Sequence, residues 1–190
     1  MRSKPSKELQ EFILQNYTYE PITGIITRKG ETIALGGSYR SNGYRDIGFF
    51  FNGKGTSQLF HRAAWLLHYG EFPECGIDHI DGNKSNNKIY NLRLCTSSQN
   101  SANRRKQKNA SLTSIYKGVS LRAGKHRKPW RASINCNGKA IFIGQFGTEI
   151  EAAKAYDNKA REFFGEFSLV NLDDDGFGTP RSERYFLDLI

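Results

Sequence analysis

The chain has 190 residues, with 28 Lys and Arg against 19 Asp and Glu and a formal net charge of +9. No apolar run approaches the about 20 residues that a bilayer span needs, and the N-terminal segment lacks the apolar block of a signal peptide. The 3 cysteines, Cys75, Cys95 and Cys136, are far apart and form no C-x-x-C pair. We therefore expect a soluble, intracellular protein without a disulfide framework or a cysteine zinc site.

The positive charge is unevenly placed along the chain. Residues 172–190 carry five acidic residues and two arginines, so the remainder carries +12. An excess of that size on a small protein favours a polyanionic partner, because each Lys or Arg that neutralises a phosphate releases counterions. The alternative is a cationic surface without a specialised role.

Local signals predict a helix, a small sheet and a second helix in the first third of the chain. Leu9, Phe12 and Ile13 recur at helical spacing after Ser6, a suitable N-cap, and Pro21 limits this helix. Residues 24–60 have the pattern of a small antiparallel sheet, with turns at the Gly36-Gly37 and Asn52-Gly53 pairs. A helix over about residues 61–69 should end at Gly70.

Residues 71–102 contain the polar cluster GIDHIDGNKSNNKIYNLRLCTSSQN. Phosphodiester hydrolysis needs a base that activates water and an electrophile that neutralises charge, and Asp78 and His79 offer both kinds of group. If residues 77–79 are extended, the two side chains face opposite sides, so one would hold an ion and the other would face the water. The T-x-x-Q pattern of Thr96–Gln99 starts a helix with Asn100 in its first turn, and an amide oxygen suits Mg²⁺.

The segments DHIDGNKSNNKIYNLR…TSSQN and HRAAWLLHYGEFP resemble the HNH endonuclease family, particularly its branch in phages and mobile introns. The resemblance covers roughly residues 17–105 and implies a ββα-metal fold. It implies His79 as general base, Asp78 and Asn100 as ligands of one Mg²⁺ ion, with Mn²⁺ as an alternative, and Asn91 as the residue that orients the catalytic loop. Relatives with two C-x-x-C pairs carry a structural zinc, which we do not expect here. Cleavage should leave 5′-phosphate and 3′-hydroxyl ends.

Other polar residues near this cluster have two interpretations each. His61 and His68 could belong to the site, but on an aromatic-rich helix they could equally be core or boundary groups. The loop residues Asp81, Asn83, Asn86 and Asn87 suit turns, with Asn87 also a candidate loop stabiliser. Arg93 could contact the phosphate backbone or be an ordinary surface arginine.

The segment NRRKQKNASLT, residues 103–113, is nearly devoid of apolar side chains. It cannot bury enough surface to fold alone, so we interpret it as a basic linker that follows a phosphate backbone. Its candidate DNA contacts are Arg104, Arg105 and Lys106.

Residues 114–171 predict three strands and a helix. The strands YKGVSLR, PWRASINC and GKAIFIGQF include an Asn137-Gly138 hairpin signal, and Thr148 with Glu151 forms a T-x-x-E capping box. The helix should end at Gly165, and residues 172–190 form an acidic tail without a regular pattern until FLDLI.

This segment resembles the plant Apetala-two and ethylene-response-factor DNA-binding domain, through Gly118-Val119, Trp130, Ile143-Gly144, Ala155-Tyr156-Asp157 and Asn171. The resemblance implies a three-stranded sheet that enters the major groove with a helix packed behind it, a geometry that the groove admits. The candidate DNA contacts are Lys117, Arg122, Lys128, Trp130, Arg131, Lys139 and Phe142. Arg122 and Arg131 are the candidates for reading guanine, and the other cations should contact phosphates.

The resemblance has gaps at the positions that matter for target choice. Ser120, Asn135 and Ala140 stand where the plant pattern has contacting arginines, so the plant recognition sequence should not be transferred.

The sequence thus predicts an α+β protein. A ββα-metal HNH nuclease domain with an N-terminal antiparallel sheet (1–102) precedes the linker, a three-stranded antiparallel sheet packed on one helix (114–171) and the tail. We expect a metal-dependent endonuclease that acts on double-stranded DNA, with neither a membrane nor a small-molecule cofactor as partner. We expect a monomer, encoded by a phage or mobile element and located in the bacterial cytoplasm.

Two rival interpretations stay open. One is a site-specific DNA-binding regulator in which an inactive HNH-like part is only a scaffold. The other is an RNA-directed or structure-specific nuclease, because a basic and aromatic surface does not distinguish nucleic acids by itself.

Overall fold

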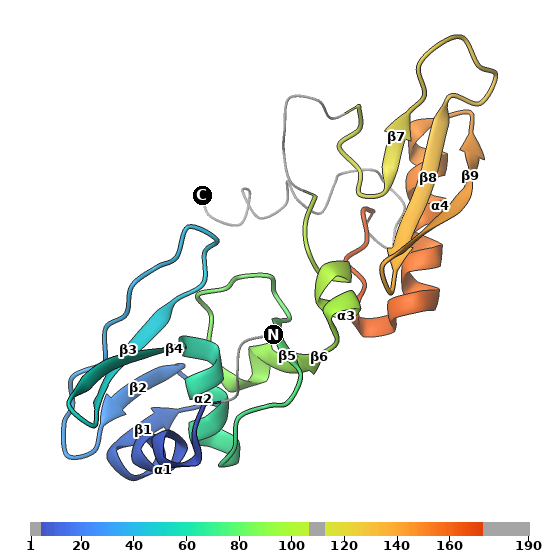
Figure 1. Ribbon diagram of the computed structural model, residues 1–190. Helices are drawn as coiled ribbons and strands as arrows, with labels where there is room; N and C mark the ends of the chain where they lie inside the picture. Colours follow the sequence, from blue (N-terminus) through green and yellow to red (C-terminus); the bar gives the residue numbers. More distant parts are fainter. Residues whose placement is uncertain (1–4, 107–112, 173–190) are drawn as a thin grey trace. The chain divides into compact units, whose positions relative to one another are not determined.

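The computed structural model describes residues 5–106 and 113–172. It divides into two compact units, Met1–Thr96 and Ser97–Ile190 (Figure 1). Both units combine short antiparallel sheets with helices, which confirms the predicted α+β class. Residues 107–112 of the predicted linker and residues 173–190 of the predicted tail lie outside the described residues. No helix in the described part of the chain is both long and apolar enough for a bilayer.

The first unit begins with a helix and two hairpins. Helix α1 (Lys7–Asn16) starts at the predicted cap, where Ser6 Oγ accepts a hydrogen bond from the Leu9 amide at 3.2 Å. Its strands are β1 (Tyr17–Glu20), β2 (Ile25–Arg28), β3 (Asp46–Phe51) and β4 (Lys54–Leu59). They pair as two separate antiparallel sheets, β1 with β2 and β3 with β4. This differs from the single predicted sheet, because β2 pairs with a strand that precedes residue 24.

The β3–β4 hairpin and the following helix form as the sequence predicts. Asn52 and Gly53 both have positive φ angles, 48° and 72°, as the tight turn of a two-residue hairpin requires. Helix α2 (Phe60–Tyr69) ends at Gly70 in the left-handed conformation. Its buried face packs in a core with Phe72 and with side chains of α1, β2, β3, β5 and β6. The buried members of this core are Leu9, Ile13, Ile26, Ile47, Phe49, Phe60, Ala63, Ala64, Leu66, Phe72, Ile77 and Leu92.

Two short strands frame the polar cluster. Strands β5 (Gly76–His79) and β6 (Leu92–Cys95) pair antiparallel, with Asp78 opposite Arg93. The connecting loop ends in the 3-10 helix η1 (Ile89–Asn91). Helix α3 (Ser97–Ala102) follows β6 directly.

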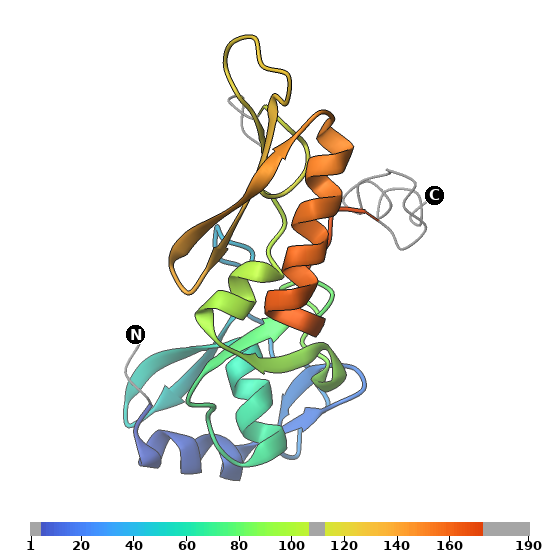
Figure 2. The same cartoon turned by 90° about the vertical axis from the view of Figure 1, so that its right-hand side faces the viewer.

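The second unit packs one long helix against a three-stranded sheet (Figure 2). The sheet has the order β7 (Val119–Leu121), β8 (Trp130–Cys136), β9 (Lys139–Phe146) and is antiparallel throughout. Helix α4 (Glu149–Phe164) begins with the predicted capping box of Thr148 and Glu151 and ends at Gly165, before the 3-10 helix η2 (Gly165–Phe167).

Helix α3 is built into this second unit. Ala102 is buried in a core cluster with Ile134, Tyr156, Ala160 and Phe164. The division between units therefore lies before α3, earlier in the chain than the predicted linker, because the last residue of this helix packs on α4 and β8.

Candidate active site and nucleic-acid interface

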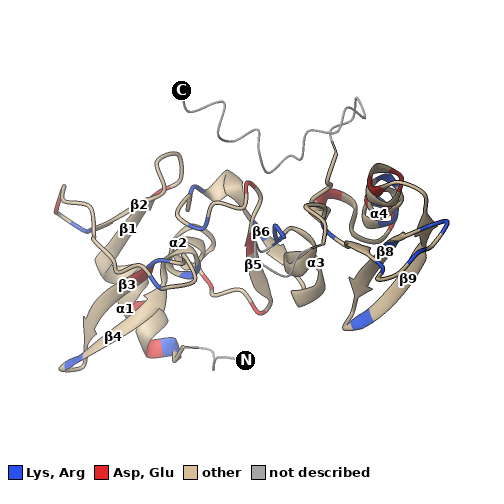
Figure 3. Ribbon diagram, turned by 90° about the horizontal axis from the view of Figure 1, so that it is seen from above, with Lys and Arg blue, Asp and Glu red and all other residues tan. Residues whose placement is uncertain are grey.

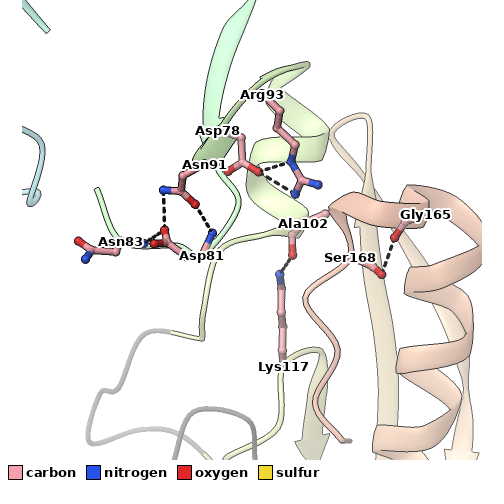
Figure 4. Close-up of polar contacts among 9 residues, drawn as sticks. All are labelled: Asp78, Asp81, Asn83, Asn91, Arg93, Ala102, Lys117, Gly165 and Ser168. Carbon is pink, nitrogen blue, oxygen red and sulfur yellow. Dashed lines mark hydrogen bonds and ion pairs between the residues drawn. The ribbon is translucent and has the colours of Figure 1, made fainter. Parts of the chain in front are cut away.

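The loop between β5 and β6 is held by a network centred on Asn91. Its Nδ2 donates to Asp81 Oδ1 at 2.9 Å and to the Asn86 carbonyl at 2.8 Å, while its Oδ1 accepts from the Asp81 amide at 3.0 Å (Figure 4). Asp81 Oδ2 also accepts from Asn86 Nδ2 at 2.7 Å. One buried side chain thereby connects the two ends of the loop and fixes the backbone that follows His79.

His79 lies at the end of β5 and is 3% exposed. Its Nε2 lies 3.0 Å from Oδ1 of Asn87, and Nδ2 of Asn87 donates to the Ser85 carbonyl at 3.3 Å. Because that amide turns its oxygen toward the ring, Nε2 carries the proton and the lone pair is on Nδ1. Burial lowers the pKa of His79, against the opposing effects of the Asn87 hydrogen bond and of Asp81 and Asp78. A neutral imidazole with a defined lone pair is the form that a general base requires.

A second histidine packs against the first. The ring centroids of His61 and His79 are 5.2 Å apart in an edge-to-face arrangement, and Tyr44 lies 5.3 Å from His61 and 6.0 Å from His79. His61 is 5% exposed and its Nδ1 has no hydrogen-bond partner among the described residues. Burial, with the nearby His79, Arg62 and Arg40, lowers the pKa of His61 to about 3. His61 is thus neutral at neutral pH and forms one wall around the candidate base.

The β1–β2 hairpin supports the loop from the other side. The Tyr19 hydroxyl donates to the Asn87 carbonyl at 2.7 Å. Gly24 has φ of +74°, and a Cβ there would lie 2.9 Å from the Lys88 nitrogen, so the turn comes close to the loop backbone. The sequence did not indicate this support, because it joins residues far apart in the chain.

Asp78 forms an ion pair across the β5–β6 ladder. Arg93 Nε and Nη2 both donate to Asp78 Oδ2, at 3.0 and 2.9 Å (Figure 4). The side chains of Arg93 and Asp78 are 13% and 5% exposed, so both charges are largely removed from water. Arg93 is therefore largely buried and orients the Asp78 carboxylate. Neither interpretation of this residue from the sequence included that contact.

Residues 5–106 and 113–172 contain no group of three or more His, Cys, Asp and Glu that could hold a metal ion. An ion at Asp78 would therefore take its other ligands from amide, phosphate or water oxygens, which suits a hard cation such as Mg²⁺. A pre-oriented carboxylate fits that requirement.

The four predicted catalytic residues fall in both units. Asp78, His79 and Asn91 lie in the first unit, around the β5–β6 loop. Asn100 lies in α3, in the second unit, and is half-buried.

The face of the β7–β9 sheet that points away from α4 carries exposed polar and aromatic side chains. The Arg131 guanidinium carbon lies 5.2 Å from the centroid of the Phe142 ring, which is 52% exposed. Arg122 Nη1 donates to Gln145 Oε1 at 2.9 Å on the same face. Lys128 and Lys139 are exposed before β8 and at the β8–β9 turn. Strands β8 and β9 carry one cation each, Arg131 and Lys139, and no acidic residue, whereas α4 carries both signs of charge (Figure 3).

Three predicted DNA contacts are placed elsewhere. Lys117 Nζ donates to the Ser101 and Ala102 carbonyls at the end of α3, and Lys106 Nζ donates to the Tyr116 and Val119 carbonyls. Burial, with repulsion from Arg104, lowers the pKa of Lys117 to about 8, and burial lowers that of Lys106. Trp130 packs against the core on the α4 side of the sheet. Arg104 and Arg105 are exposed.

The β5–β6 region lies within a segment that is similar to a known protein family. Residues 58–102 match the sequence model of the HNH endonuclease family. The matched segment includes all four predicted catalytic residues, Asp78, His79, Asn91 and Asn100. The uncharacterized HNH endonuclease L560 of Acanthamoeba polyphaga mimivirus is 38% identical over 121 residues, which cover 63% of this chain and 60% of that protein.

Two further proteins are similar to parts of the chain. DNA endonuclease I-HmuI of Bacillus phage SP01 is 37% identical over 90 residues, covering 46% of this chain and 49% of that protein. A solved structure of DNA binding and cleavage by the HNH homing endonuclease I-HmuI aligns at 33% identity and a TM-score of 0.40, covering 46% of this chain and 51% of that chain. The AP2-like ethylene-responsive transcription factor ANT of Arabidopsis thaliana is 42% identical over 62 residues, 32% of this chain and 11% of that protein.

These matches differ in what they support. The predicted resemblance to HNH endonucleases is confirmed for residues 58–102. The Apetala-two resemblance receives only weak support from one short match. The chain covers less than two thirds of the length of each of these relatives.

Proposed function

We propose that this protein is an HNH-type, metal-dependent DNA endonuclease. The observation that carries the proposal is the orientation of His79. Asn87 fixes the imidazole tautomer, and burial beside His61 keeps the ring neutral, at the centre of a segment with the HNH pattern. Such an imidazole can accept a proton from the water that attacks a phosphodiester.

The remaining residues of the motif have supporting roles in this proposal. Asp78, which Arg93 orients, and Asn100, which the family pattern assigns, would hold one divalent ion, most suitably Mg²⁺ and alternatively Mn²⁺. The ion would supply charge stabilisation at the scissile phosphate and the leaving oxygen. Asn91 holds the loop that follows His79, so that the base keeps its orientation during the reaction.

Double-stranded DNA is the proposed partner, and the C-terminal sheet is the proposed targeting surface. Arg122 and Arg131 with the exposed Phe142 ring offer cations and an aromatic side chain on one face, and Lys139 is exposed at the β8–β9 turn. A three-stranded sheet of this kind can enter the major groove, while lysines and arginines at its margin contact phosphates. Ser120, Asn135 and Ala140 on this sheet are exposed and uncharged, which supports a target different from that of the plant factors. The location in a bacterial host cytoplasm stays a prediction.

A cleavage assay tests the proposal. Wild-type protein should cut plasmid or host-genome DNA in the presence of Mg²⁺ or Mn²⁺, and His79→Ala should lose about 10²–10⁴-fold in rate, the usual contribution of a general base. His126→Ala is the matched control, because His126 is exposed on a loop of the second unit. Equal cutting by wild type and His79→Ala would contradict the general-base assignment. Tight, site-specific binding without metal-dependent cleavage would favour the DNA-binding regulator, and preference for RNA or single strands would favour the third interpretation.

A further inference from the structure

Helix α3 does not have a sequence that would hold it in a helical conformation by itself. Its six residues, SSQNSA, include three serines and an asparagine, which are weak helix formers. A helix of this length is unstable in isolation, since nucleation is costly and few intrahelical hydrogen bonds form. Its conformation must come from the residues that pack around it.

Those contacts come from the second unit, far along the chain. Ala102 is 6% exposed within the cluster of Ile134, Tyr156, Ala160 and Phe164, and its carbonyl accepts from the Leu169 amide at 3.3 Å. At the other end of the helix, Ser98 Oγ accepts from the Asn137 amide, in the β8–β9 turn, at 3.0 Å. The C-terminal sheet and α4 therefore contact α3 at both of its ends.

Lys117 adds a further contact, at the C-terminus of α3. Its ammonium donates to the Ser101 carbonyl at 3.1 Å and to the Ala102 carbonyl, the last carbonyl groups of α3. Figure 4 shows the contact with Ala102. A cation at a helix C-terminus satisfies carbonyls that have no intrahelical partner and interacts favourably with the helix dipole.

The backbone of Lys117 is itself fixed. Asn171 Oδ1 accepts from the Lys117 amide at 2.6 Å, and Asn171 Nδ2 donates to the Lys117 carbonyl at 3.0 Å. The Asn171 amide donates in turn to Asp157 Oδ1 on α4 at 2.8 Å. A continuous chain of hydrogen bonds thus runs from α4 through Asn171 and Lys117 to α3.

We propose that Lys117 is a positioning residue for α3, and that the C-terminal unit therefore supports the helix carrying Asn100 in addition to any contact it makes with DNA. The part of this inference that concerns catalysis rests on the proposed nuclease function. Lys117 holds the helix backbone, and Asn100 lies on that helix. The side chain that the plant resemblance assigns to DNA contact serves α3 instead.

Hydrogen exchange on the full-length protein tests the structural part directly. In K117M, amides of residues 97–103 should exchange about tenfold faster than in wild type, as the loss of a helix C-terminal cation predicts. Amides of α4 should keep their protection. Lys154→Met is the matched control, because Lys154 is an exposed lysine on α4, and it should leave both segments unchanged. If the amides of residues 97–103 exchange in K117M at the wild-type rate, the proposal is overturned.

A second variant keeps the test decisive if K117M also loosens α4. Ser98→Ala removes the acceptor for the Asn137 amide but introduces a better helix former, so local helix propensity would predict slower exchange of α3. Faster exchange of the α3 amides, with unchanged exchange of the α4 amides, supports the proposal that the rest of the second unit holds α3 in its helical conformation. Unchanged or slower exchange of α3 overturns it.

The catalytic consequence is measured separately. At saturating DNA, K117M should cleave about tenfold more slowly than wild type with an unchanged KM, because α3 is loosened while the outer face of the sheet is intact. A wild-type kcat, or a change in KM alone, would contradict the positioning role. His79→Ala distinguishes the two failures: if it cleaves as fast as wild type, the proposed function fails, whereas the exchange result for α3 still stands.

Discussion

The β5–β6 loop and the outer face of the β7–β9 sheet are both polar, but they use their polar groups in opposite ways. In the loop, Asn91, Asn87 and Asp81 direct their side chains inward, to one another, to His79 and to the backbone. On the outer face of the sheet, Arg131 and Phe142 are exposed. A site that must hold one side chain in a defined orientation has its hydrogen bonds made in advance, whereas a surface that binds a polyanion leaves its cations in water.

The cations of the second unit show the same contrast within one region. Lys106 and Lys117 donate to backbone carbonyls and have lowered pKa values because of burial. Arg131 instead lies beside an exposed aromatic ring. Positive charge on this unit is therefore divided between structural and surface roles, and the net charge alone overstates the number of exposed cations.

Removal of the Asn87 side chain is the largest expected effect in this comparison. Asn87→Ala should lower the cleavage rate about 10–100-fold, the usual effect of removing a partner that orients a site imidazole. The reason is that His79 loses the acceptor that fixes its tautomer. Single-turnover cleavage with saturating DNA measures this, and thermal unfolding checks the fold. Ser85→Ala is the control, since it keeps the carbonyl that Asn87 contacts; a wild-type rate in Asn87→Ala would mean that the inward network has no catalytic role.

Acid should destabilise the first unit through His61. Its folded-state pKa of about 3 lies below the ordinary value of 6.5, so between these limits the unfolded chain takes up a proton that the folded chain does not. The free energy of unfolding should therefore fall as the pH drops below 6.5, by up to about 1.4 kcal/mol per pH unit.

Denaturant unfolding at several pH values measures this dependence. His61→Phe should flatten the slope between pH 6.5 and 3, because it removes the buried imidazole that faces His79, Arg62 and Arg40. His126→Gln should not, since His126 is exposed. An unchanged acid slope in His61→Phe would show that His61 is not held neutral by the fold.

The smallest expected effect concerns the contrast between exposed cations and cations that donate to backbone carbonyls. Lys139→Ala should weaken DNA binding and reduce the slope of log K against log salt by about 0.9, as expected for one phosphate contact of an exposed lysine. Lys106→Met should leave that slope unchanged, because its ammonium is engaged with the Tyr116 and Val119 carbonyls. Binding measured across a salt series decides this. Equal losses of slope in the two variants would remove the distinction between surface and structural cations.

Much of the local architecture was predictable. The Ser6 cap, the Asn52-Gly53 turn, the end of α2 at Gly70 and the capping box of Thr148 all form as expected. These signals need only neighbouring residues, because caps and tight turns are decided by local hydrogen bonds and by φ angles.

The candidate site was predictable in its members and only partly in its connections. Asp78 and His79 were singled out from their chemistry and Asn91 from the resemblance to HNH endonucleases, and the structure gathers them around one loop. Asn87 was expected to be a turn residue or a loop stabiliser, because Asn is common in turns, and its contact with His79 was not predicted. The spacing of Asn87 from His79, eight residues within a loop between paired strands, is the signal that could have found it.

By itself the sequence determined the helix caps, the tight turns, the α+β class and the types of residue available for chemistry, because each depends on residues that are neighbours in the chain. Only the tertiary structure decided which polar groups face one another. It turned Asn87 toward His79, Arg93 toward Asp78, and Lys117 away from the sheet surface and onto the last turn of α3. The physical reason is that a side chain's partners are set by residues brought close through folding, which neither composition nor local periodicity records.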